Sequence, residues 1–100
     1  MKFTNEQLKT TFECPDNPKV RQVLAYDEAT LLGAPVRGLY DRLWEGVCTA
    51  LVTDWQSPIE RSPATLNDSA SPEAVEVIKW ASLALFSWYI DWKERAVPKN

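Results

Sequence analysis

The side chains that could do covalent or acid–base chemistry are few in this chain of 100 residues. It contains no histidine, so it lacks both the commonest general base and the commonest zinc ligand. Cys14 and Cys48 lie far apart in the sequence, and neither has a histidine to activate it as a nucleophile. We therefore expect no metal site, no catalytic thiol and no cofactor.

Two pairs of carboxylates remain as groups that could exchange protons: Asp27 with Glu28, and Asp41 with Glu45. Nothing beside them in the sequence supplies a nucleophile or an oxyanion site, so a solvated helix face is the simpler interpretation. The 3 glycines follow neither of the glycine-rich patterns that hold phosphate groups. The sequence thus predicts a protein that is not an enzyme.

The charge balance bears on the class of partner. Eleven Lys and Arg against 14 Asp and Glu give a net charge of -3, which disfavours direct binding to nucleic acid. The chain shows no secretory leader and no apolar run of about 18 residues, so we expect no membrane span. These features predict a cytoplasmic protein, in which both cysteines stay reduced.

The longest predicted element is a helix from Ser71 to Arg95. Ser71 can cap its start, and Pro72 suits the first helical position. One stripe of this helix carries apolar residues at helical spacing: Ala74, Val77, Ile78, Ala81, Leu85, Trp88 and Trp92. The middle of its reverse side is also apolar, with Trp80, Leu83, Phe86 and Ile90. We expect this reverse side to be covered by the segment 55–71 or by another chain.

Two further helices are predicted before residue 33. Thr4 and Gln7 match a capping box, which predicts a helix over residues 5–13. A second helix is predicted over residues 18–32, with a stop at Gly33. Asp27 falls on the apolar face of that helix, where a carboxylate needs a partner or a nearby break in the helix.

A fourth amphipathic helix is predicted to begin at Pro35. Its apolar stripe consists of Val36, Leu39, Tyr40, Leu43, Val47, Ala50 and Leu51. Gly46 lies within it, and because a helical glycine costs about 1 kcal/mol relative to alanine, it indicates a close contact between helices. Between residues 55 and 71, Ser-Pro pairs predict one or two single-turn helices, held on the body by Ile59 and Leu66. No strand pattern of useful length is seen. The prediction is one all-α domain, residues 1–100, with four main helices.

The chain carries more large aromatic side chains than a core of this size easily encloses, including 5 tryptophans. Tryptophan and tyrosine dominate the hot spots of protein interfaces, so part of this set is expected to contact a partner. For the tryptophans on the main helix stripe, Trp88 and Trp92, burial in the core is the simpler expectation. For Trp80 and Phe86 on the reverse side, core and interface remain open alternatives.

The sequence as a whole resembles a family of known proteins. The resemblance extends from Met1-Lys2-Phe3-Thr4-Asn5-Glu6-Gln7-Leu8, through Trp88-Tyr89-Ile90-Asp91-Trp92, to Pro98-Lys99-Asn100. The chain is similar to small phage-encoded anti-CRISPR proteins that inhibit type I-F surveillance complexes. The resemblance covers length, acidity and helical character but no shared motif. It implies a non-enzymatic inhibitor that binds the proteins of a host RNA-guided complex and blocks its access to target DNA.

A DNA-binding surface on such a complex would be basic, so acidic side chains beside apolar ones are expected to meet it. The predicted partner-binding residues are Tyr26, Asp27, Glu28, Asp41, Glu45 and Trp55. The alternative is a phage or bacterial assembly or regulatory subunit, possible as a homodimer, that self-associates through the surface from Trp80 to Ile90.

Overall fold

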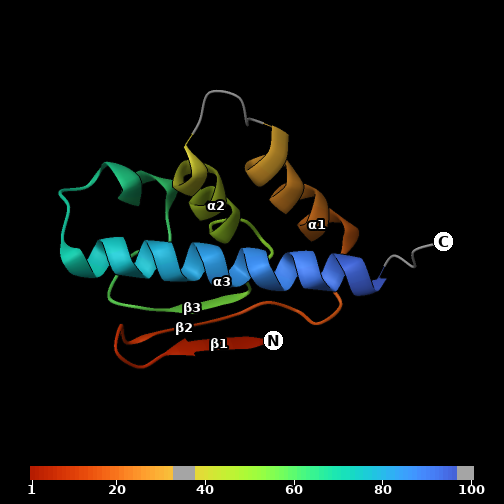
Figure 1. Ribbon diagram of the computed structural model, residues 1–100, viewed down its shortest axis with the longest axis horizontal. Helices are drawn as coiled ribbons and strands as arrows, with labels where there is room; N and C mark the ends of the chain where they lie inside the picture. Colours follow the sequence, from red (N-terminus) through yellow and green to blue (C-terminus); the bar gives the residue numbers. More distant parts are fainter. Residues whose placement is uncertain (33–37, 97–100) are drawn as a thin grey trace.

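The structure, a computed structural model, describes residues 1–32 and 38–96. This part of the chain forms three α-helices and one antiparallel sheet with the strand order β1-β2-β3. The longest helix, α3, runs across the middle, with α1 and α2 on one side and the sheet on the other (Figure 1). The elements are β1 (Lys2–Asn5), β2 (Thr10–Glu13), α1 (Val20–Asp27), α2 (Leu39–Val47), β3 (Asp54–Gln56) and α3 (Pro72–Ala96). The prediction of an all-α bundle with four main helices is therefore wrong.

The larger error lies at the N-terminus, where β1 and β2 form a hairpin in place of the helix predicted over residues 5–13, and β3 was not predicted either. The Asn5 side chain accepts the backbone N–H of Leu8 at 3.1 Å, and Lys9 adopts a positive φ of 52°. Polar side chains near a chain reversal can satisfy a turn as well as a helix start. The side chain that accepts a hydrogen bond in this turn is thus that of Asn5, one residue after the predicted cap Thr4.

A row of aromatic rings crosses the sheet and explains why the strands form. Phe3 lies opposite Phe12, which in turn lies opposite Trp55 on β3. The Phe3 and Phe12 rings stack at 4.5 Å, and Phe12 and Trp55 lie 5.7 Å apart. Trp80 of α3 meets Phe12 edge-on at 5.5 Å, and Trp44 of α2 meets Trp55 at 5.7 Å. The row thus joins the sheet to both helices, and Phe12 at its centre is fully buried.

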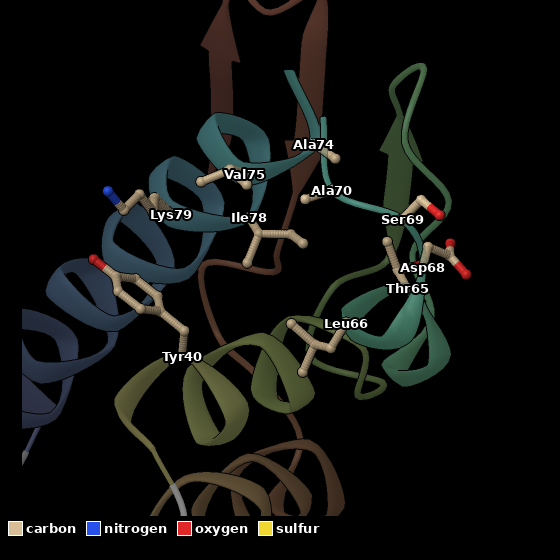
Figure 2. A pocket seen from close by; sticks show the side chains of 10 residues that line it. All are labelled: Tyr40, Thr65, Leu66, Asp68, Ser69, Ala70, Ala74, Val75, Ile78 and Lys79. Carbon is tan, nitrogen blue, oxygen red and sulfur yellow. The ribbon is translucent and has the colours of Figure 1, made fainter. Parts of the chain in front are cut away.

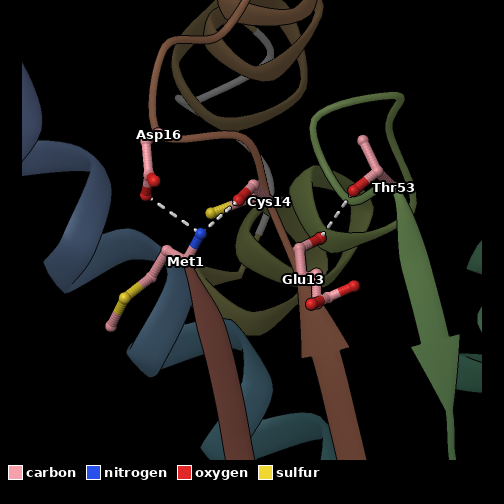
Figure 3. A network of polar contacts seen from close by, with 5 residues as sticks. All are labelled: Met1, Glu13, Cys14, Asp16 and Thr53. Atoms are coloured by element: carbon pink, nitrogen blue, oxygen red, sulfur yellow. Dashed lines mark hydrogen bonds and ion pairs between the residues drawn. The ribbon is translucent and has the colours of Figure 1, made fainter.

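Polar contacts fix both edges of β2 beyond this row (Figure 3). The Met1 ammonium donates to the Cys14 carbonyl at 2.8 Å and pairs with the Asp16 carboxylate at 3.0 Å. On the other edge, the Thr53 N–H donates to the Glu13 carbonyl at 2.9 Å. These bonds extend the ladder by one step on each side of the strand.

α1 begins at Val20, two residues after the predicted start, and continues as a π-helical segment, η1 (Glu28–Leu32). The Thr30 carbonyl in this wider turn accepts a hydrogen bond from the Arg42 guanidinium at 3.2 Å. Asp27, at the junction, has the partner that its apolar surroundings require, because Tyr89 donates its hydroxyl proton to the carboxylate. The predicted helix stop at Gly33 and the predicted helix start at Pro35 lie outside the described residues.

Gly46 of α2 packs closely against α1 and η1. A Cβ atom placed there would lie 2.6 Å from Cε1 of Tyr26 and 2.8 Å from Cγ2 of Thr30. No carbon atom can occupy that position unless these neighbours move. The predicted close helix contact at Gly46 is therefore confirmed.

The segment after β3 is held on the body by two tryptophan indoles. Trp55 donates its Nε1 proton to the Ile59 carbonyl at 2.8 Å, and Trp44 donates to the Ser62 carbonyl at 2.8 Å. Ser62 then caps a single 3₁₀ turn, η3 (Pro63–Asn67), as its Ser-Pro pair predicts. Leu66 packs against the core, in agreement with its predicted role as an anchor.

α3 matches the predicted helix almost residue for residue, and the Ser71 hydroxyl accepts the N–H of Ala74 at 3.1 Å as its cap. Phe12 of β2 contacts Trp80 edge-on on the reverse side, a cover that the prediction of the segment 55–71 or another chain did not include. The sheet was absent from the predicted fold. Farther along the same side, Leu83 and Ile90 are 46% and 41% exposed.

Candidate partner-binding site

Two of the predicted partner-binding residues, Tyr26 and Asp27, make contacts inside the protein. The Tyr26 ring is fully buried and lies 4.6 Å from the ring of Tyr89. Asp27 accepts the Tyr89 hydroxyl and pairs with the Lys93 ammonium at 3.6 Å. Burial first, and then the hydrogen bond to Asp27, raises the pKa of Tyr89 well above its ordinary value. These side chains join α1 to α3, and Tyr26 offers no surface to a partner in this fold.

Trp55 packs in the aromatic row and is half-buried, so only part of its side chain could contact a partner. The remaining predicted residues lie at or near the surface. Glu28 and Asp41 are exposed, and Glu45 is partly exposed on the same helix as Asp41. The Asp41 carboxylate also accepts the N–H of Gly38 at 3.3 Å, which helps to start α2. Among the predicted residues, Glu28 and Asp41 are therefore the exposed carboxylates, and Glu45 is partly exposed.

The two thiols are poor nucleophiles in this fold. Burial raises the pKa of Cys14 to about 11, and it does the same to Cys48. A thiol with such a pKa holds its proton at neutral pH, and the protonated form is unreactive. Among residues 1–32 and 38–96, no three or more His, Cys, Asp or Glu side chains gather in a way that could hold a metal ion. None of the described helices is long and apolar enough to cross a bilayer.

A concave pocket of about 200 Å³ lies where the start of α3 meets η3 and the start of α2 (Figure 2). Its lining is mainly apolar and includes Leu66, Ala70, Ala74, Val75 and Ile78. Ile78 in this lining is nearly buried, whereas Val75 is 40% exposed. Apolar pockets with a few polar groups around them are typical ligand or partner sites.

The polar side chains around this pocket are divided between its two sides (Figure 2). Tyr40 and Lys79 lie on one side, and Thr65, Asp68 and Ser69 lie on the other. The two charged residues among these, Lys79 and Asp68, are exposed. The pocket therefore has a positive and a negative side separated by an apolar centre.

A second hollow, of about 330 Å³, lies between the loop after β2 and the end of α3. Trp88 and Trp92 stack there at 6.3 Å, and Asp16, Asn17 and Arg95 complete the lining. Both indoles are partly buried and pack against the core, as expected, but neither is fully enclosed. Much of this lining is polar, and Asp16 and Arg95 already form ion pairs with Met1 and Asp91. This hollow is larger and more polar than the pocket at the start of α3.

Comparison with known proteins identifies no relative. The chain matches no family model, and no curated protein or solved structure matches it significantly.

The sequence did not predict a binding site at the apolar pocket. Leu66 was expected to anchor the segment, and Ile78 to lie in the core, and both do so. The signal that could have pointed to a pocket is the pair of small residues, Ala70 and Ala74, beside larger apolar neighbours. A hollow forms only because η3 and α2 stand on either side of them, and that arrangement is set by tertiary contacts.

Proposed function

We propose that this protein is a non-enzymatic inhibitor that binds the type I-F CRISPR RNA-guided surveillance complex and blocks target DNA binding. The observation that carries the binding role is the apolar pocket at the surface of an acidic domain, with charged residues on both of its sides. Such a surface can supply buried contacts and electrostatic attraction to a basic partner. The choice of partner rests on the resemblance to anti-CRISPR proteins. The protein would act in the cytoplasm of the host cell.

The chemistry of the described residues supports binding in preference to catalysis. The thiols are held protonated by burial, and Asp27 is engaged with Tyr89 and Lys93. The exposed acidic residues Glu28 and Asp41 are suited to attract a basic surface that would otherwise bind DNA. Competition for that surface requires no covalent step.

Surface plasmon resonance with the purified surveillance complex is the direct test. The parent protein is expected to bind, and the complex loaded with it is expected no longer to shift target DNA on a native gel. The double variant Glu28→Lys, Asp41→Lys should associate more slowly and with a weaker dependence on salt.

The matched control is Glu6→Lys, Glu94→Lys, which changes the net charge equally at two other exposed positions. If both double variants lose association rate equally, net charge and not a local acidic surface governs the encounter. If the parent protein does not bind the complex, the proposed function is refuted.

Self-association is a second candidate function, because Leu83 and Ile90 are exposed on one side of α3. They lie seven residues apart and therefore near one face of the helix, with the partly exposed Phe86 between them. Light scattering of the pure protein decides this alternative. A dimer that dissociates in the variant Leu83→Glu would support it, and a monomer would exclude it.

A further inference from the structure

The volume of the apolar pocket limits what can fill it. At about 200 Å³ it is smaller than the roughly 300–1,000 Å³ of sites that enclose a whole drug-sized ligand. It is larger than the apolar cavity of about 150 Å³ that is sufficient for benzene. The pocket therefore matches one ring-sized apolar group better than a complete cofactor or metabolite.

The walls of the pocket are set before any occupant arrives. The Thr65 hydroxyl donates to the Glu60 carbonyl at 2.8 Å, and the Trp44 indole holds Ser62 at the start of the same turn. On the opposite wall, Ser71 caps the first turn of α3, which carries Ala74. A preformed pocket loses little conformational entropy on binding, so a small contact there can contribute strongly to affinity.

Two charged residues flank the pocket on opposite sides and give it a direction. Lys79 lies on the side of Tyr40, and Asp68 lies on the side of η3 (Figure 2). A chain that crosses the mouth would be attracted if it carried an acidic residue near Lys79 and a basic residue near Asp68. A chain with the reverse order of charges would be repelled at both sides.

We infer that this pocket is a socket for one aromatic side chain of the partner protein, presented between an acidic and a basic residue. The volume selects a ring, the fixed walls provide a preformed hollow, and the charges on its two flanks orient the segment that carries the ring. Aromatic side chains bury a large apolar area at low entropic cost and are enriched among interface hot spots. The inference rests on the proposed function in assigning the socket to a protein partner.

Nuclear magnetic resonance with N-acetyltryptophanamide as the probe tests the socket independently of any partner. Saturable shifts are expected at the backbone amides around the pocket, including Ala70, Ala74, Val75 and Ile78. N-acetylleucinamide, which lacks a ring, is expected to bind several-fold more weakly. Shifts that are absent, or that centre on Trp88 and Trp92, would overturn the inference.

A pair of alanine variants then separates the pocket from the rest of the surface. Ala74→Leu fills the hollow and is expected to weaken probe binding by at least about tenfold. Ala64→Leu makes the same change at an exposed position of η3 that does not line the pocket, and it should bind the probe normally. Circular dichroism of both variants checks that the domain is folded, and unchanged probe binding by a folded Ala74→Leu overturns the inference.

The same variants connect the socket to the proposed partner. Ala74→Leu is expected to lose affinity for the surveillance complex, and Ala64→Leu is expected to keep it. Equal affinity of the two variants would overturn the assignment of the socket to that interface. If the parent protein does not bind the complex at all, the proposed function fails, while the probe titration still decides whether the pocket accepts an aromatic ring.

Discussion

Gly46→Ala is the substitution whose effect on stability the structure determines most directly. The new Cβ atom would lie 2.6 Å from Cε1 of Tyr26 and 2.8 Å from Cγ2 of Thr30. Both neighbours are buried, and the Tyr26 ring is backed by Tyr89, so neither can move freely. Overpacking in a core costs about 1–3 kcal/mol, and two simultaneous clashes place this site near the upper value. Alanine regains about 1 kcal/mol of helix propensity, which leaves a net loss of about 2 kcal/mol.

Urea unfolding followed by far-UV circular dichroism measures this loss as a change in the midpoint at constant slope. Thr30→Ser removes the clashing methyl group and keeps the hydroxyl that donates to the Tyr26 carbonyl at 2.8 Å. The double variant should therefore recover about 0.5–1 kcal/mol relative to the sum of the single changes. A Gly46→Ala protein that is more stable than the parent by about 1 kcal/mol, as for an unhindered helix position, would refute the close approach of α1 and α2.

Three further predictions concern the core. Tyr89→Phe should destabilise the fold by about 1.5–3 kcal/mol, because it removes a hydrogen bond to the Asp27 carboxylate. Tyr26→Phe should be neutral or stabilising, because the Tyr26 hydroxyl is buried and has no hydrogen-bond partner among the described residues. Urea midpoints that fall equally in both variants would contradict this distinction. Burial raises the pKa of Tyr26 and Tyr89 above the unfolded value of about 10. The free energy of unfolding should therefore be independent of these two groups below about pH 10 and fall as the pH rises further. Phenolate absorbance and the loss of far-UV circular dichroism should appear together. Phe12→Ala should cost about 3–5 kcal/mol in thermal or urea unfolding, whereas Leu24→Ala, at an exposed position, should change stability by less than about 0.5 kcal/mol.

Elements defined by local chemistry could be predicted from the sequence. Ser71 with Pro72 marks the start of α3, and Ser62 with Pro63 marks the start of η3, because a hydroxyl cap and a fixed φ act within one turn. The close contact at Gly46 was also predictable, since a glycine in a helix needs a compensating reason. The need of Asp27 for a partner followed from its place on an apolar face, although the identity of Tyr89 did not.

The sheet could not be predicted in the same way, because its stabilising contacts are distant in the sequence. β2 is only four residues long, and its buried side chains, Thr10 and Phe12, show alternation over too few positions to outweigh a capping-box signal. Phe12 is held by Phe3, Trp55 and Trp80, which come from three other elements. Local signals at Thr4 and Gln7 fit either outcome, and long-range packing selects the hairpin.

The candidate site was predicted even less completely, for a related reason. Exposed carboxylates such as Glu28 and Asp41 are evident from helical spacing alone. A pocket, in contrast, is a space between elements, and it depends on how far apart α2, η3 and α3 stand. Burial of Tyr26 depends likewise on α3, which supplies the Tyr89 ring against it.

The position of α3 between the two outer layers has a consequence for how the chain acquires its structure during synthesis. Every element that α3 joins is made before it, yet α3 supplies the side chains at the centre of the core, among them Val77, Ala81 and Leu85. A ribosome adds about 5–20 residues per second, so the first 70 residues wait for a second or more before this helix is complete. During that interval Phe12 lacks Trp80, the α3 side chain that packs edge-on against it, so this part of the future core stays exposed. We therefore expect the domain to fold in one cooperative step, only after α3 has been synthesised.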